Sequence, residues 1–233
     1  GTGGGKTYFL LTLIEALLHT DAILYILDPK NADLADLGTV MPNVYHTKEE
    51  MIDCVNSFYE GMVQRSEEIK RHPNYKTGEN YAYLGLPPCF LIFDEYVAFF
   101  EMLGVKESTS LLSQLKKIVM LGRQAGYFLI VACQRPDAKY FSDGIRDNFN
   151  FRVGLGRISE LGYGMLFGSD VKKQFFQKRI KGRGYCDVGT SVISEFYTPL
   201  VPKGHDFLQT IGSLAQARQD GTATCEAKGD GTD

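Results

Sequence analysis

The chain has 233 residues, of which 44% are hydrophobic and 23% are charged. That length is sufficient for one α/β domain with a full hydrophobic core, and the composition excludes wholesale disorder. The formal net charge of -3 excludes a globally basic DNA-coating protein, while a local basic face stays compatible with it.

The cysteines and histidines do not form a metal-binding or disulfide pattern. The five cysteines are odd in number and scattered, with no C-x-x-C pair, and the four histidines lack metal-ligand spacing. This usage favours a reducing, cytoplasmic setting. No uninterrupted apolar stretch approaches the roughly 18 residues that a membrane span needs, so any membrane anchor is expected outside this chain.

The first half of the chain alternates between helix and strand patterns. Apolar residues from Phe9 to Leu18 recur at helical spacing, and a short apolar strand at 23–27 ends at Asp28-Pro29-Lys30. Thr47 and Glu50 form a capping-box pattern that begins a long helix. Residues 72–88 are polar, with Gly and Pro, and predict an exposed loop.

The second half continues the alternation. The elements expected there are strands at 89–93, 127–133 and 151–155, a helix around 111–119 ending near Gly122, a strand pair within 182–201 and a closing helix at 204–217. Strands alternating with helices predict an α/β fold with a mainly parallel sheet flanked by helices. We therefore expect one domain at 1–217, followed by a polar, disordered tail at 218–233.

The first chemistry-bearing motif is Gly3-Gly4-Gly5-Lys6-Thr7, which matches the end of a phosphate-binding loop, G-x-x-x-x-G-K-[ST]. The glycines let backbone N–H groups converge on phosphate oxygens at a helix N-terminus. Lys6 would reach the β- and γ-phosphates of ATP, and the Thr7 hydroxyl would hold Mg²⁺. The first glycine of the motif falls one residue before Gly1, so only part of the motif is expected here. The alternative is a flexible Gly-rich linker, against which the adjoining apolar helix counts.

The second motif is the apolar run Leu91-Ile92-Phe93 followed by Asp94 and Glu95, which has the Walker B form. Asp94 would hold Mg²⁺ through its water shell, and Glu95 would orient and polarise the attacking water. The alternative is an ordinary strand end with surface acids. A lysine-bearing glycine loop and an Asp-Glu strand end together are much more specific than either alone.

A third candidate is Gln134, which follows the apolar strand predicted at 127–133. A polar amide beside the γ-phosphate can contact both that phosphate and the water, and so respond to hydrolysis. The alternative is a loop residue that caps the strand end.

These motifs, taken together, resemble the FtsK/SpoIIIE family of DNA-translocating ATPases. The resemblance extends to about Leu208 and rests on Gly-Gly-Gly-Lys-Thr, Asp28-Pro29-Lys30, Phe93-Asp94-Glu95-Tyr96, Gly122-Arg123-Gln124-Ala125-Gly126, Gln134-Arg135-Pro136 and the segment 147–153. Within the family, the chain is most similar to the DNA-transfer, coupling-protein-like members of conjugative elements.

The resemblance implies a RecA-like P-loop NTPase fold, a homohexameric ring and ATP-driven movement along DNA. It also implies that the strand leading into the phosphate loop is missing from this chain. The family's glutamine maps onto Gln134. Arg123 matches the position proposed to project into a neighbouring subunit's nucleotide, with Arg152 as the second choice; for either, the alternative is a surface salt-bridge arginine. The family's winged-helix domain is not evident.

The leading hypothesis is therefore a hexameric, ATP-dependent DNA translocase of conjugative transfer. The alternatives are a related motor of a protein secretion system and a non-hydrolysing nucleotide-binding assembly module, against which the intact Lys6, Thr7, Asp94 and Glu95 count. Expected partners are DNA, other copies of the chain, and a relaxase or transfer machinery. The full-length protein is expected in the cytoplasm at the inner face of the membrane, tethered through a segment outside this chain. Either a DNA-contacting or a merely solvated basic surface is expected from Lys172, Lys173, Lys178, Arg179, Lys181 and Arg183.

Overall fold

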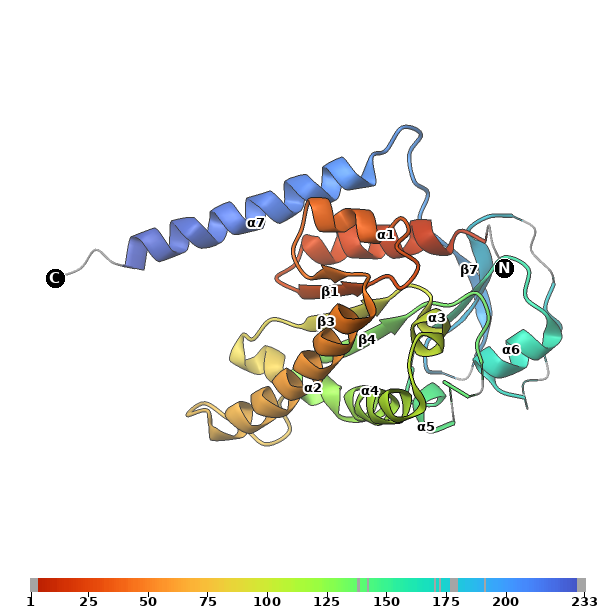
Figure 1. Cartoon of the computed structure of the whole chain (residues 1–233), viewed down its shortest axis with the longest axis horizontal. Coiled ribbons are helices and arrows are strands. Elements are labelled where there is room, and N and C mark those ends of the chain that lie inside the picture. Colours follow the sequence, from red (N-terminus) through yellow and green to blue (C-terminus); the bar gives the residue numbers. More distant parts are fainter. Residues whose placement is uncertain are drawn as a thin grey trace.

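The computed structural model describes residues 4–137, 139–141, 143–169, 171, 173–176, 180–190 and 192–229 (Figure 1). The elements of the N-terminal half are α1 (Lys6–Leu18), β1 (Ile23–Leu27), η1 (Ala35–Thr39), β2 (Val44–Tyr45), α2 (Lys48–Arg71), η2 (Tyr81–Leu84), β3 (Cys89–Phe93) and α3 (Tyr96–Glu101). The remainder comprises α4 (Val105–Ala125), β4 (Tyr127–Val131), α5 (Asp143–Arg146), β5 (Arg152–Leu155), α6 (Glu160–Phe167), β6 (Arg183–Asp187), β7 (Ser194–Tyr197) and α7 (Phe207–Gly229).

A four-stranded parallel sheet in the order β2-β1-β3-β4 forms the centre of the molecule. The carboxyl ends of its three longer strands are in register, because Leu27 pairs with Phe93 and Phe93 pairs with Val131. Within the described residues, β4 has a strand partner on one side only. This architecture confirms the predicted α/β fold with a mainly parallel sheet.

The alternation of side chains along each strand divides the core into two layers. Leu24 and Ile26 of β1 pack with α1, η1 and α7, whereas Tyr25 and Leu27 pack with α2, α3 and α4. Figure 1 shows α1 and α7 on one side of the sheet and α2 and α4 on the other. Strands buried on both faces require the near-continuous apolar runs that the sequence contains.

A second, three-stranded antiparallel sheet in the order β5-β6-β7 lies at the carboxyl end of the first. The predicted strand pair within 182–201 is confirmed as β6 and β7, and the strand predicted at 151–155 joins them as β5. A side chain at Gly184 would overlap the carbonyl oxygen of Gly154, so glycine allows the close approach of β5 and β6.

Helix α7 is longer than the sequence pattern predicted. The closing helix was expected to end at Ala217, with a tail from 218 onward, but α7 continues to Gly229. The Arg218 guanidinium donates hydrogen bonds of 2.8 Å to the carbonyl oxygens of both Thr20 and Ala22, which ties the helix to the turn after α1. This contact is between residues far apart in sequence, so local composition did not indicate it. Residues 230–233 of the expected tail lie outside the described residues.

The sequence also did not predict several short elements, which are the helices α3, α5 and α6, the 3-10 helices η1 and η2, and the strand β2. Helices α3 and α6 have six and eight residues, too few for a helical period to stand out from the sequence. Across the described ranges, none of the helices combines the length and the apolar character that crossing a bilayer demands.

Candidate functional site

The N-terminus of α1 is presented by a tightly packed glycine loop. Gly5 caps the helix with φ 93°, a conformation that favours glycine. A Cβ at Gly4 would lie 3.0 Å from Leu155 O, and one at Gly5 would lie 2.9 Å from Gly182 N. Gly182 N donates a 3.0 Å hydrogen bond to Gly4 O. The second sheet therefore holds the loop, and the first-turn N–H groups of α1 are offered to an anion. Gly3 lies outside the described residues.

Gly182 is a residue of this site that the sequence analysis did not single out. We expect Gly182→Ala to destabilise the protein by about 2 kcal/mol in urea unfolding, because Gly182 has φ 75° and an added Cβ would overlap Thr198 Oγ1. Gly85→Ala is the matched control, since Gly85 has φ 69° with nothing within 4 Å of an added Cβ. The control should cost about 1 kcal/mol. Equal losses in the two variants would show that the contact with Thr198 has no energetic weight.

Two carboxylates project from the carboxyl end of β3, where the strand turns into α3. Asp94 and Glu95 are only 5% and 7% exposed. Glu95 has φ 56°, a left-handed conformation that is uncommon for a residue with a side chain. Backbone strain of this kind costs on the order of 1–3 kcal/mol and occurs where function requires a particular side-chain direction.

Lys6 connects the glycine loop to these carboxylates. Its Nζ lies 2.7 Å from Asp94 Oδ1 and also pairs with Glu95 Oε1. Burial by itself would lower the pKa of Lys6, but the hydrogen bonds and charges of the two carboxylates outweigh burial and raise that pKa. Burial would likewise raise the pKa of Glu95, but Lys6 and Lys30 hold it below its usual value. For Asp94, burial prevails over Lys6, and its pKa is raised.

A further cation, Lys30, reaches the same site from the loop after β1. Its Nζ lies 3.4 Å from Glu95 Oε2. The preceding Asp28 is fully buried and accepts hydrogen bonds from the backbone N–H groups of Lys30 (3.2 Å), Ala32 (2.8 Å) and Ala35 (3.0 Å). Asp28-Pro29-Lys30 is one of the motifs that carry the family resemblance, but the sequence did not indicate a role for Lys30 at the site. Its position after a predicted strand was the available signal, because parallel strands end at one edge of the sheet.

Gln134, at the end of the neighbouring strand β4, joins the group through its backbone. Its N–H donates a 3.4 Å hydrogen bond to Glu95 Oε2, and its exposed side chain lines the same cavity as Lys6 and Glu95. The carboxyl ends of β1, β3 and β4 thus bring Lys30, Glu95 and Gln134 together at the N-terminus of α1.

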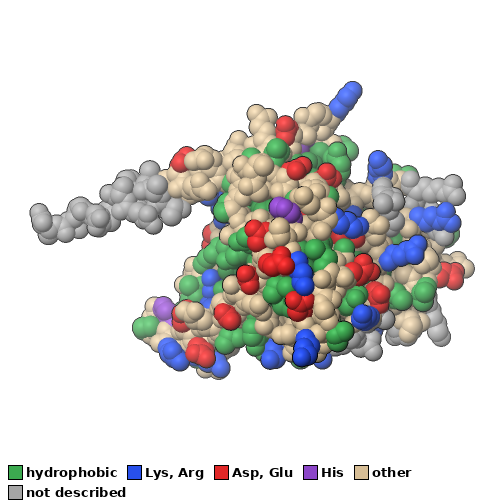
Figure 2. Space-filling view, viewed as in Figure 1, with side chains coloured by type: hydrophobic (Ala, Val, Ile, Leu, Met, Phe, Trp, Pro, Cys, Tyr) green, Lys and Arg blue, Asp and Glu red, His purple; other side chains and the backbone are tan. Residues whose placement is uncertain are grey.

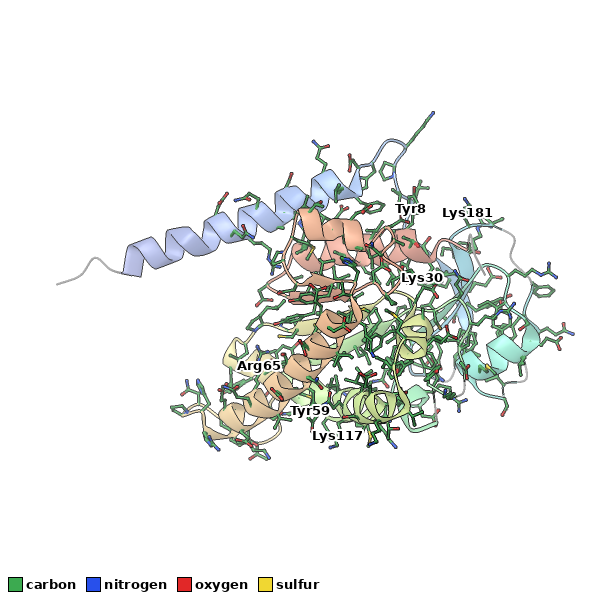
Figure 3. All side chains as sticks on the ribbon, viewed as in Figure 1. Tyr8, Lys30, Tyr59, Arg65, Lys117 and Lys181 are labelled. Carbon is green, nitrogen blue, oxygen red and sulfur yellow. The ribbon has the colours of Figure 1, made fainter. Side chains whose placement is uncertain are left out.

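The cavity above these residues has a volume of about 1540 Å³ and continues along β4 and β5. Figure 3 shows Lys30, Lys181 and Tyr8 around the N-terminal end of α1. On the face drawn in Figure 2, acidic and basic side chains are interspersed, and the coloured, described side chains form no continuous basic surface there.

Arg123 and Arg152, the two arginines considered for contact with a neighbouring subunit's nucleotide, have different surroundings. Arg123 is exposed in the last turn of α4, just before the amino end of β4. The site lies at the carboxyl end of β4, so the length of that strand, roughly 17 Å, separates the two ends. In contrast, Arg152 pairs with the buried Asp187 at 2.7 Å and donates to Leu166 O. Arg152 is therefore engaged within its own subunit, while Arg123 is exposed and lines the far part of the same cavity along β4.

Half of the basic run falls within the described residues. Lys173 Nζ donates to Ile193 O and lies 5.5 Å from the ring centroid of Tyr185, so it has partners within the fold. Lys181 and Arg183 are exposed, with Arg183 5.0 Å from the ring centroid of Tyr197. The other three residues, Lys172, Lys178 and Arg179, lie outside the described residues.

The donor set at the site fits a magnesium ion shared with phosphates. Asp28 and Glu95 lie close enough to Asp94 to act on it electrostatically, and Lys6 and Lys30 pair with Asp94 and Glu95. In the described part of the chain, no group of three or more His, Cys, Asp or Glu residues could enclose a metal. Mg²⁺ commonly takes only one or two protein oxygens together with substrate phosphates. Thr7 and Asp94 line the same cavity, so the Thr7 hydroxyl could supply such an oxygen and Asp94 could hold the ion through its water shell.

Sequence comparison finds proteins that are similar to this chain. No protein-family model matches the chain. The chain is 55% identical over 234 residues, all of its length, to the Ftsk domain-containing protein YdcQ of Bacillus subtilis (strain 168). It is 26% identical, over 84% of its length, to the ESX secretion system protein YukB of the same organism. The chain spans 48% of YdcQ and 14% of YukB, so it corresponds to half or less of each relative.

Solved structures agree on the fold. The pCW3 conjugation coupling protein TcpA, in a monomer form with ATPγS, matches with a TM-score of 0.74 at 20% identity, over 93% of this chain and 62% of TcpA. The cytoplasmic domain of the Thermomonospora curvata type VII secretion ATPase EccC matches with a TM-score of 0.66 at 20% identity, over 92% of this chain and 27% of EccC. The identity to YdcQ shows a domain like that of an Ftsk domain-containing protein, and the solved structures of FtsK-like ATPases share its fold.

Proposed function

We propose that this domain hydrolyses ATP to move DNA through a hexameric ring during conjugative transfer. The observation that carries the proposal is the meeting of Lys6, Asp94 and Glu95 at the N-terminus of α1. An anion-binding helix end beside two buried carboxylates is the arrangement that phosphoryl transfer to water requires. The similarity to a protein named as a conjugation coupling protein supports DNA as the transported polymer.

Phosphate binding falls to α1 and its glycine loop. The N–H groups of the first helical turn and the helix dipole attract the phosphate oxygens, and Gly4 and Gly5 let the backbone approach them closely. Lys6 is placed to reach the β- and γ-phosphates, exchanging its carboxylate partners for phosphate oxygens. When bound by Thr7 and Asp94, Mg²⁺ would neutralise charge on the phosphate oxygens.

Activation of water falls to Glu95. Its carboxylate, held below its usual pKa, is ionised at neutral pH and can accept a hydrogen bond from the attacking water. Gln134 lies next to Glu95, where its amide can contact both the water and the γ-phosphate. Since little covalent chemistry is left to the protein, positioning of this kind supplies most of the rate.

The test of the DNA substrate is the rate of ATP hydrolysis by the full-length protein with single-stranded DNA, with double-stranded DNA and without DNA. We expect at least one form of DNA to raise the rate. DNA binding should weaken steeply as salt rises, because a motor that grips every sequence holds mainly the phosphates. Hydrolysis that neither form of DNA raises would argue against a translocase.

A protein secretion motor is the second candidate, because the chain is also similar to YukB and to EccC. Under that alternative, hydrolysis would respond to a secretion-substrate peptide and not to DNA. Adding such a peptide and DNA separately to the same preparation therefore separates the two functions.

The exposure of Arg123 gives a prediction for assembly. If Arg123 completes the site of a neighbouring subunit, mixing Arg123→Ala protein with Glu95→Gln protein should restore part of the ATP hydrolysis that each lacks. Some interfaces in mixed rings then combine an intact Arg123 with an intact Glu95. Arg71→Ala is a suitable control for Arg123→Ala, because Arg71 is an exposed helix-end arginine that pairs with Glu67 of its own helix. Mixed proteins that stay inactive would count against Arg123 acting across an interface.

A further inference from the structure

Lys30 is the second cation on the carboxylate of Glu95, and it binds a different oxygen from Lys6. Lys6 pairs with Oε1, whereas Lys30 Nζ lies 3.4 Å from Oε2. In the described part of the chain, these two lysines form the ion pairs of Glu95. Oε2 also accepts the hydrogen bond from Gln134 N, so Lys30 and the loop after β4 both contact this oxygen.

The backbone that presents Lys30 is held firmly. Asp28 N donates to Tyr45 O of β2, and the Asp28 side chain accepts the three N–H groups described above, including that of Lys30 itself. Asn31, the next residue, takes a left-handed φ of 48° and donates to Asp28 O. The hydrogen bonds that the fully buried Asp28 carboxylate accepts all come from N–H groups of this segment. The turn therefore fixes the origin of the Lys30 side chain relative to the end of β3.

The two lysines differ in what they are free to do. Lys6 stands at the start of α1, and phosphate binding would draw its ammonium away from Glu95 Oε1. Lys30 comes from the loop after β1, not from the glycine loop, and pairs with the other oxygen of the Glu95 carboxylate. It can keep its contact with Oε2 while Lys6 binds phosphate.

We propose that Lys30 is a positioning residue for ATP hydrolysis, which holds the Glu95 carboxylate in its water-activating orientation once Lys6 has turned to the phosphates. This role rests on the proposed function of the site. The competing assignment is that Lys30, whose side chain is 45% exposed at the cavity, is itself a phosphate ligand. A positioning residue affects turnover, whereas a phosphate ligand also affects affinity for the nucleotide in the ground state.

The test compares Lys30→Met and Lys30→Arg in the full-length protein. We expect Lys30→Met to lower kcat by about 10- to 100-fold, since misplacement of a reacting group by about 1 Å has effects of that size. The Kd for a fluorescent ATP analogue should change by less than about threefold, because ground-state contacts with the phosphates persist. Lys30→Arg should recover most of kcat, because a guanidinium can hold the same oxygen. Lys48→Met is the matched control: Lys48 also bridges two elements by pairing with a glutamate, Glu107, at 2.9 Å, but away from the site.

The double variant Lys30→Met/Glu95→Gln shows whether Lys30 acts through Glu95. If it does, the double variant should have the same residual kcat as Glu95→Gln alone. A further fall in the double variant, a Kd that weakens in parallel with kcat, or an unchanged kcat in Lys30→Met would each overturn the positioning role. An unmodified protein that does not hydrolyse ATP would instead overturn the proposed function, and the role of Lys30 with it.

Discussion

Glu95→Gln in the full-length protein is expected to lower kcat for ATP hydrolysis by about 10²–10⁴-fold, the range that a positioned general base contributes. The amide keeps the size of the side chain but cannot accept a proton from water or polarise it as a carboxylate does. Nucleotide affinity should stay within about threefold of the unmodified protein, because the phosphates are held by α1 and Lys6. The two values come from phosphate-release kinetics and from titration with a fluorescent ATP analogue.

Glu101→Gln is the control for this prediction. Glu101 ends the same short helix that Glu95 caps, but it is exposed and outside the cavity lining. Its replacement should leave both values unchanged. Normal turnover in Glu95→Gln would remove Glu95 from the chemistry, and a loss of affinity equal to the loss of kcat would assign it to binding instead.

Lys6→Ala is expected to give the largest loss of nucleotide affinity of any single substitution in the glycine loop. In the proposed function its ammonium would contact phosphates in the ground state as well as in the transition state. Truncating one partner of a close charge pair costs about 2–5 kcal/mol, which is about 30- to 4000-fold in Kd. Removing Lys6 also leaves Asp94 and Glu95 without their shared cation, and these carboxylates would repel the phosphates.

Lys106→Ala is the control for this second prediction, because Lys106 is an exposed lysine in the first turn of another helix, α4. Its replacement should not alter nucleotide affinity. Thermal unfolding of both variants shows whether a loss of binding reflects a loss of fold. A folded Lys6→Ala protein that binds ATP as tightly as the unmodified protein would contradict the assignment of the phosphate loop.

Much of the fold could be predicted from local sequence. The strands at 23–27 and 89–93 are short apolar runs followed directly by polar residues, and helix α1 has apolar residues at helical spacing. Each of these signals lies within one segment, which is why sequence reasoning found them. Lys6, Asp94 and Glu95, which the structure brings together, could be singled out for the same reason, since each stands in a short motif next to its own element.

The features that sequence reasoning missed depend on contacts between distant segments. Gly182 is needed because its backbone packs against Gly5, 177 residues earlier in the chain. The contact of Lys30 with Glu95 depends on the pairing of β1 with β3 and on the left-handed backbone of Glu95, neither of which has a local pattern. The contacts of Arg218, the first residue of α7 past Ala217, with the turn after α1 likewise join segments that are distant in the sequence.

A structure of the full-length Glu95→Gln protein with Mg²⁺, ATP and DNA would show directly whether ATP binds at the N-terminus of α1. We expect the β- and γ-phosphates at the N-terminus of α1, with Lys6 moved from Asp94 onto the phosphates and Thr7 and Asp94 on the side of the metal. Residue 95 should face the γ-phosphate, and Arg123 of an adjacent copy should approach it. ATP bound elsewhere, or Lys6 still paired with Asp94 beside a bound nucleotide, would contradict the account.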